Sequence, residues 1–183
     1  MFDPLGMSDR AHASVDRARG LDHDLRAAGK FIIEHRDAQG NLKGKYELPN
    51  GIVDVGIHHL LDSGFRATAQ ITAWYIGLID NAGFTALANG DTMSSHTGWA
   101  ESTAYSNANR VQWSPIAAAT RLITNTTTSD FNINAAATLK GIFITSNNTK
   151  GGTTGTLWST AAFGSNVTVA NGDTLKITYT LSG

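Results

Sequence analysis

The chain has 183 residues, 14 basic and 15 acidic side chains, a formal net charge of −1 and no cysteine, which excludes disulfides, thiolate metal ligands and a cysteine nucleophile. A chain of this length suits one well-packed core, and its balanced charge predicts no surface for binding nucleic acid. No apolar run reaches the ~20 residues that a membrane-spanning helix needs, and the amino terminus lacks a signal-peptide pattern, so we expect no membrane partner.

The composition changes abruptly at Ala67. No threonine precedes this residue, whereas 22 threonines follow it, together with only ten of the charged side chains. Threonine that alternates with apolar residues is typical of half-buried strands. We therefore expect a charged N-terminal arm, residues 1–29, and a β-sandwich domain, residues 30–183. Within that domain, residues 30–66 are predicted to form a hairpin and a short helix, and residues 67–183 the sandwich body.

The arm carries apolar residues at spacings of three and four, with charged side chains on the other faces. This pattern predicts a weakly amphipathic helix, whose stripe has few large side chains. We expect the arm to lie on a neighbouring molecule or on the body, as a helix or partly extended. The residues of the stripe are Val15, Ala18, Leu21, Leu25 and Ala28.

Two strand patterns and one helical pattern come next. Residues 31–36 and 42–48 flank a segment with Gly40 and Asn41, which supply the positive φ angles that a hairpin turn needs. Residues 52–63 are predicted to form a short helix that ends at Gly64. The apolar residues expected to share one face of this helix are Val53, Ile57, Leu60 and Leu61.

The rest of the chain has the pattern of an antiparallel sandwich. Residues 70–80 are apolar on both faces and predict a central strand, and residues 81–109 form a long irregular segment of the kind that is usually functional or interface-forming. Short strands separated by Gly, Asn and Ser turns follow, so we expect an all-β antiparallel β-sandwich, jelly-roll or Ig-like. These strands are expected at residues 110–113, 121–125, 130–134, 138–145, 156–162, 167–169 and 173–181.

The sequence gives little support for an enzyme. His58 and His59 are adjacent, so on a helix they point about 100° apart and do not match the i, i+4 spacing of a helical zinc site. Glu101 is the one glutamate after Ala67, and only Asp91 in the same long segment offers it a partner for glycoside hydrolysis. The sequence contains no Gly-x-Ser-x-Gly motif whose serine His96 could activate in a Ser–His–Asp triad. We expect no catalytic residue, no metal site and no cofactor.

The aromatic residues offer candidates for an interface. Trp74 lies in an apolar strand and is predicted to be core, whereas Trp99 in the long segment is predicted to be exposed, in contact with another subunit or with a ligand. The Thr- and Asn-rich residues 147–156 are interpreted as a mobile hairpin tip. The residues we select as a candidate interface are Trp99, His96, Trp113, Phe31 and Tyr46.

Several strings resemble small structural proteins encoded in the capsid-gene region of tailed bacteriophages. They include Asn50-Gly51-Ile52-Val53-Asp54-Val55-Gly56, Asp91-Thr92-Met93-Ser94-Ser95-His96-Thr97-Gly98-Trp99 and Ser146-Asn147-Asn148-Thr149-Lys150-Gly151-Gly152-Thr153-Thr154-Gly155-Thr156-Leu157-Trp158. The resemblance covers roughly residues 31–183.

The resemblance implies a head decoration, or cement, protein. Such a protein is made in the host cytoplasm and sits on the capsid exterior, where it binds the major capsid protein as a homodimer or homotrimer. The arm and hairpin are then expected to lie across neighbouring capsid subunits. Two alternatives stay open: a carbohydrate-binding or host-recognition appendage of the phage tail or head, and a sugar-active enzyme.

Overall fold

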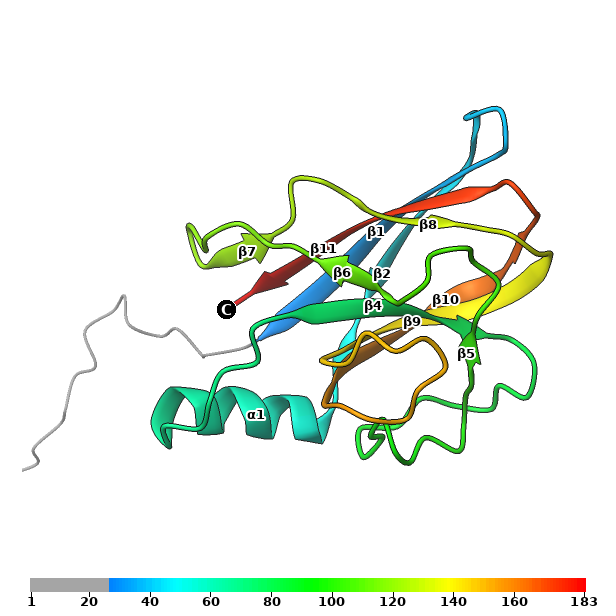
Figure 1. Cartoon of the computed structure of the whole chain (residues 1–183). Helices are drawn as coiled ribbons and strands as arrows, with labels where there is room; N and C mark the ends of the chain where they lie inside the picture. Colours follow the sequence, from blue (N-terminus) through cyan, green and yellow to red (C-terminus); the bar gives the residue numbers. More distant parts are fainter. Residues whose placement is uncertain (1–26) are drawn as a thin grey trace, which may run out of the picture.

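The computed structural model describes residues 27–183, and the arm pattern from Val15 to Leu25 lies outside this range. Two antiparallel sheets pack face to face, and one helix lies beside the second sheet (Figure 1). The predicted all-β sandwich with one short helix is confirmed. Within residues 27–183, no helix has both the length and the apolar character that a membrane span requires.

The first sheet has the order β2-β1-β11, with β7 and β8 both paired to β11. β1 alternates strictly: Phe31, Ile33 and His35 are buried, and the residues between them are more exposed. Alternation with a period of two lets one face of a strand enter the core. The bounds are β1 (Ala28–Arg36), β2 (Leu42–Pro49), β7 (Leu122–Thr124), β8 (Ser129–Asn132) and β11 (Thr174–Ser182).

The predicted hairpin exists, but it is an integral part of the sandwich. β1 pairs with β2 on one side and with β11 on the other, in register from Ala28 opposite Ser182 to Arg36 opposite Thr174. The hairpin is therefore part of the first sheet, with β2 at the edge of that sheet, and its expected contact with neighbouring capsid subunits stays a prediction.

The second sheet has the order β3-β10-β9-β4-β5, and β6 also pairs with β4. Residues 157–169 form one long strand where the sequence predicts two, and its register shifts between Ala162 and Val167. The exposed residues at this irregularity resemble a turn in sequence. The bounds are β3 (Gly51–Ile52), β4 (Trp74–Asp80), β5 (Glu101–Ser102), β6 (Val111–Trp113), β9 (Ala137–Thr145) and β10 (Leu157–Val169).

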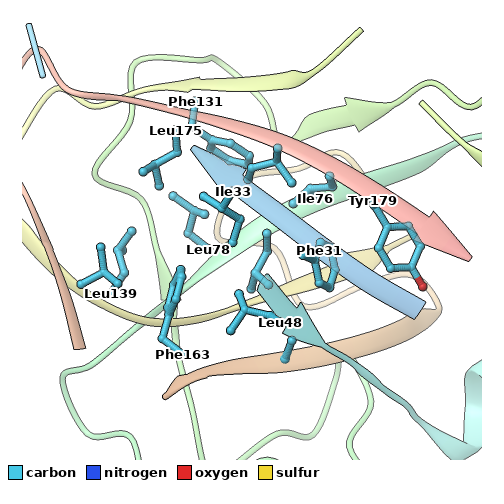
Figure 2. Close-up of a cluster of buried hydrophobic side chains, with 14 of the residues drawn as sticks. Phe31, Ile33, Leu48, Ile76, Leu78, Phe131, Leu139, Phe163, Leu175 and Tyr179 are labelled. Atoms are coloured by element: carbon cyan, nitrogen blue, oxygen red, sulfur yellow. The ribbon is translucent and has the colours of Figure 1, made fainter. Parts of the chain in front are cut away.

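The main core lies between the two sheets (Figure 2). The rings of Phe31 and Tyr179 lie with their centroids 4.5 Å apart, and neither side chain is exposed to solvent. Ile76 and Leu78 of β4 face them from the second sheet. Burial of such side chains stabilises each by about 1.5–3 kcal/mol relative to an exposed position.

The helix α1 (Asp54–Phe65) confirms the helical prediction, but its end and its packing differ from expectation. Gly64 lies inside the helix, and Ala67 takes the left-handed conformation with φ 55°. Only the first turn packs closely: Val53 donates its N–H to the Trp158 carbonyl oxygen over 3.1 Å, and Gly56 is buried. Leu60 and Leu61, predicted to belong to the apolar face of the helix, are 41% and 46% exposed.

Candidate functional site

The long segment from residue 81 to 109 is folded onto the second sheet. The Trp99 indole N–H donates to the Asp91 carboxylate over 2.9 Å, and the same oxygen accepts the Ala88 backbone N–H at 2.9 Å. The His96 ring stacks on the Trp99 ring with centroids 3.9 Å apart. Trp99 packs on Phe143 and is only 4% exposed, so the prediction that it is exposed is wrong.

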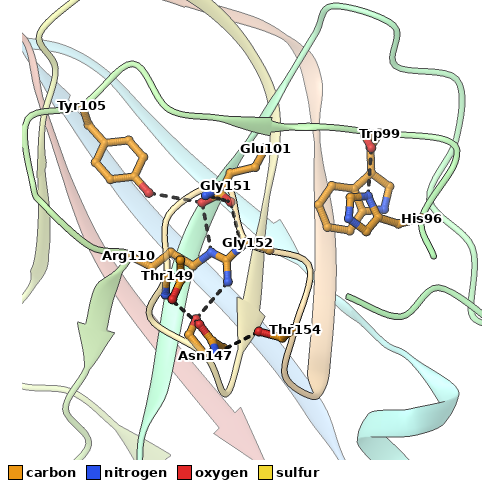
Figure 3. A network of polar contacts seen from close by, with 10 residues as sticks. All are labelled: His96, Trp99, Glu101, Tyr105, Arg110, Asn147, Thr149, Gly151, Gly152 and Thr154. Carbon is orange, nitrogen blue, oxygen red and sulfur yellow. Dashed lines mark hydrogen bonds and ion pairs between the residues drawn. The ribbon is translucent and has the colours of Figure 1, made fainter. Parts of the chain in front are cut away.

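Glu101 and Arg110 form a buried bidentate ion pair at the end of this segment (Figure 3). Arg110 Nε donates to Glu101 Oε1 over 3.0 Å, and Arg110 Nη2 donates to Glu101 Oε2 over 2.7 Å. The Arg110 side chain is 0% exposed and the Glu101 side chain is 7% exposed. Two parallel hydrogen bonds of this kind fix orientation as well as charge.

The ion pair also fastens the Thr- and Asn-rich turn between β9 and β10 (Figure 3). Arg110 donates to the Asn147 carbonyl oxygen over 2.9 Å and to the Gly152 carbonyl oxygen over 2.6 Å. In return the Gly151 N–H donates to Glu101 Oε2 over 2.8 Å. The turn predicted to be a mobile hairpin tip is therefore bound at several points to the segment before it.

The two carboxylates that could have served a glycosidase hold structural hydrogen bonds instead. Glu101 accepts from Arg110, from the Gly151 amide and from the Tyr105 hydroxyl, which lies 3.2 Å from Oε1. Burial, and then the nearby Glu101 charge, raise the pKa of Tyr105, so its hydroxyl stays a donor. Asp91 is engaged by Trp99 and Ala88.

The described histidines also serve packing roles. His59 lies edge-on to the Trp74 ring at 5.8 Å, at the junction between the helix and the second sheet, and His58 is exposed. His35 is buried, with Nε2 2.7 Å from the Asp173 carboxylate. Among residues 27–183, no three His, Asp or Glu side chains are grouped so that they could hold a metal ion.

Asp173 is a second polar anchor that the sequence does not reveal. Its Oδ2 accepts from Lys43 Nζ over 2.7 Å and from the Ala170 N–H over 2.9 Å, and it faces His35. Burial alone would raise the pKa of Asp173, but the bonds from Lys43, Ala170 and His35 outweigh it and lower the pKa to about 2. The anchor ties the β10–β11 turn to the first hairpin.

β7, the C terminus and α1 lie at the end of the sandwich opposite the turn of the first hairpin (Figure 1). Side chains from these three elements line an apolar groove. One part of the groove has a volume of about 610 Å³ and is lined by Trp74, Trp113 and Trp158. A second part, of about 260 Å³, is lined by Ala27, Leu61 and Leu122 among others. The two parts share Leu60, Ile123 and Leu181.

The structure does not bring the five candidate interface residues together. Phe31 and Trp113 belong to the main core, and Trp99 belongs to a second cluster with His96 stacked on it. Tyr46 is half-buried, with its ring edge-on to Phe163 at 5.3 Å. In this single chain, Phe31, Trp99 and Trp113 are too buried to contact a partner directly.

The large apolar side chains that are exposed come from other positions. Apart from Leu42 near the first hairpin turn, they lie on α1 and on the segment around β7. Sequence reasoning missed them because a helical stripe normally faces the core. These residues are Leu60, Leu61, Phe65, Ile116 and Leu122.

Comparison with known proteins adds no relationship. No protein-family model matches the chain, and the search of curated proteins gives no match. The resemblance to phage structural proteins therefore stays an expectation from the sequence strings.

Proposed function

We propose that this chain is a structural protein of a bacteriophage virion, a decoration protein that binds the major capsid protein lattice and stabilises the head. The observation that carries the proposal is the apolar end of the sandwich, where the described part of the chain begins at Ala27. Exposed apolar side chains that gather on one face mark association surfaces in soluble proteins. Here Leu60, Leu61 and Leu122 surround the groove at the point where Ala27 enters the described body.

The rigidity of the body supports the same role. A protein that clamps a shell has to transmit force between its contacts without unfolding locally. The Glu101–Arg110 pair and the Asp91–Trp99 bond hold the long segment and the β9–β10 turn to the sheet. Buried polar networks whose members are all satisfied have this rigidifying effect.

The stabilising action follows from mass action. A ligand that binds the assembled shell but not its free subunits shifts the equilibrium toward assembly, by about 2.7 kcal/mol per site at a concentration of 100 times Kd. The chain has 14 basic and 15 acidic side chains and a net charge of −1, so attachment is expected to depend weakly on salt. A homodimer or homotrimer of the chain would multiply the number of contacts with the lattice.

The test is to add purified full-length chain to undecorated heads, with host polysaccharide as a parallel ligand. We expect bound copies to saturate at a number set by the capsid lattice, and the temperature at which heads rupture to rise. Saturable binding to polysaccharide, with none to heads, would contradict the proposal.

That contrary result would favour the second candidate, a carbohydrate-binding appendage. Its specific support is Trp74, which is half-buried beside Gln70 and Gln112 on the wall of the groove. Aromatic faces next to hydrogen-bonding side chains suit sugar rings. The Trp74 ring already packs on Trp158 and His59, with centroids 5.8 Å apart in both cases, which leaves less of it for a ligand.

A further inference from the structure

We infer that β2, the edge strand of the first sheet, pairs antiparallel with β2 of a second copy of this chain, which gives a two-fold dimer with one continuous sheet. Such a dimer goes beyond the proposed function, because it forms in the free protein. The pairing leaves the apolar groove open, since no residue of β2 lines it, and it leaves the turn of the first hairpin outside the paired residues.

The register of β2 on β1 fixes which main-chain groups of β2 point outward. β2 is the last strand of the first sheet and pairs only with β1. The Asn50 N–H donates to the Gly29 carbonyl oxygen over 3.0 Å. Hydrogen-bonded pairs alternate along an antiparallel ladder, so Tyr46 bonds to β1, whereas the N–H and C=O groups of Lys45 and Glu47 point away from it.

The outer edge of β2 is open in the part of the chain that the structure describes. Among residues 27–183, no hydrogen bond engages the outward main-chain groups of Lys45 and Glu47. Pro49, which has no N–H, also falls at an outward position, where a proline removes no bond to β1. Unpaired N–H and C=O groups along a sheet edge are a template on which another strand can pair.

The charges of β2 are complementary to a second β2 in one register. Lysine on an edge strand usually prevents pairing, but Lys45 and Glu47 are both exposed on the same face of the strand. When Tyr46 lies opposite Tyr46 of the second copy, Lys45 lies opposite Glu47 of the second copy, and the two-fold axis repeats this pair. Each pair exchanges both of its outward main-chain bonds, and unlike charges directly opposite each other are stabilising. A register that places Lys45 opposite itself brings like charges together and is disfavoured.

Tyr46 lies at the two-fold axis in this register. Its side chain is half-buried at the margin of the core, with its ring edge-on to Phe163 at 5.3 Å. Tyr46 and its copy form a pair without hydrogen bonds, in which the Cα atoms lie about 4.5 Å apart and the side chains approach closely. Aromatic residues directly opposite each other stabilise antiparallel pairing. The charged pairs on one face and the tyrosine pair on the other therefore favour the same register.

Charge reversal in the full-length protein tests the pairing, with sedimentation over a range of concentrations as the measurement. Lys45→Glu and Glu47→Lys each place like charges opposite each other, so each should raise the dissociation constant of the dimer at least roughly tenfold. An equimolar mixture of the two variants restores unlike pairs and should dimerise like the wild type, and so should the double variant Lys45→Glu with Glu47→Lys. Arg66→Glu, at a side chain that is 76% exposed, is the matched control and should leave the dimer unchanged.

A cysteine at the two-fold axis tests the register, because the chain has no cysteine of its own. Oxidation should link Tyr46→Cys into a covalent dimer, since opposite residues of a pair without hydrogen bonds lie within reach of a disulfide. Leu42→Cys, at a side chain that is 54% exposed, is the control and should not cross-link, because this register keeps its two copies far apart.

Urea unfolding curves like that of the wild type show that each variant is folded. A wild-type protein that stays monomeric would overturn the inference. A dimer that survives both single charge reversals would do the same, because it places self-association on another surface. A folded double variant that stays monomeric, or equal cross-linking of the two cysteine variants, would contradict the register.

Discussion

The Glu101 carboxylate and the Arg110 guanidinium face each other in a bidentate pair, with N to O distances of 3.0 and 2.7 Å. The two residues are nine positions apart in sequence, and the Arg110 side chain has no exposed surface. Because Arg110 also binds the Asn147 and Gly152 carbonyl oxygens, this one side chain connects the long segment to the β9–β10 turn. The relationship explains how a neutral, Thr-rich surface segment keeps a fixed shape.

Replacement of Arg110 by methionine is expected to lower the free energy of unfolding by about 3–5 kcal/mol, because it leaves a buried carboxylate without its partner. Urea unfolding measures the change. The double variant Arg110→Met with Glu101→Gln should be less destabilised than Arg110→Met alone, since the buried charge is removed. As a control, Lys30→Met breaks an exposed pair with Glu47 and should cost less than ~1 kcal/mol.

The Asp173 anchor predicts a loss of stability in acid. The pKa of Asp173 in the folded chain is about 2, against an ordinary value of 3.8, so its contribution is complete above pH 3.8 and is lost as the pH falls toward 2. Asp173→Asn should lower the free energy of unfolding at pH 7 by about 2 kcal/mol. Urea melts between pH 7 and 2 should show the difference from wild type shrinking below pH 4. A difference that stays constant over this range would contradict the assignment.

Two glycines of α1 are expected to respond in opposite directions to alanine. A Cβ at Gly56 would lie 2.5 Å from the Trp158 carbonyl oxygen, so Gly56→Ala should push the helix from β10 and destabilise the fold. A Cβ at Gly64 would meet nothing within 4 Å. Gly64→Ala should therefore stabilise the protein by about 0.5–1 kcal/mol through helix propensity. Thermal unfolding compares the two, and equal shifts would be inconsistent with the close contact at Gly56.

The turn before β7 predicts a stabilising substitution. Thr120 and Arg121 have φ angles of 49° and 62°, and Ala119 and Leu122 exchange two backbone hydrogen bonds of 2.9 Å across them. Such a two-residue turn favours Asn, whereas β-branched Thr is strained there. Thr120→Asn should raise the free energy of unfolding by about 0.5–1 kcal/mol. Thr126→Asn, at an exposed position outside the positive-φ region, is the control and should change it by less than ~0.5 kcal/mol.

The sequence predicted the positions of the strands better than it predicted which side chains are exposed. Strands such as β11 follow from strict alternation, in which Leu175, Ile177 and Tyr179 are buried and the residues between them are not. Helix α1 followed from its spacing of apolar residues. The packing of α1 did not follow from this spacing, because it depends on the approach of Gly56 to a strand about 100 residues later in the chain.

Sequence patterns also could not predict the polar contacts between residues that lie far apart in the chain. Trp99 was predicted to be exposed because it lies in a long irregular segment, but Asp91 and Phe143 bury it. Arg110 and Glu101 gave no local signal beyond being rare charges in a neutral region. Because the sequence did not reveal these buried contacts, the candidate interface included aromatic residues that the fold buries. The exposed Leu60, Leu61 and Leu122 became apparent only from the fold.

The central claim is that the apolar end of the sandwich attaches this chain to a capsid. Its most direct test is the affinity for undecorated heads of Phe65→Asp with Ile116→Asp, which are 81% and 50% exposed at that end, against Leu42→Asp near the first hairpin turn. The account predicts that the first variant binds heads at least roughly tenfold more weakly, because apolar contacts are lost, and that Leu42→Asp binds like wild type. Equal affinity of all three for heads, with normal unfolding curves, would contradict it.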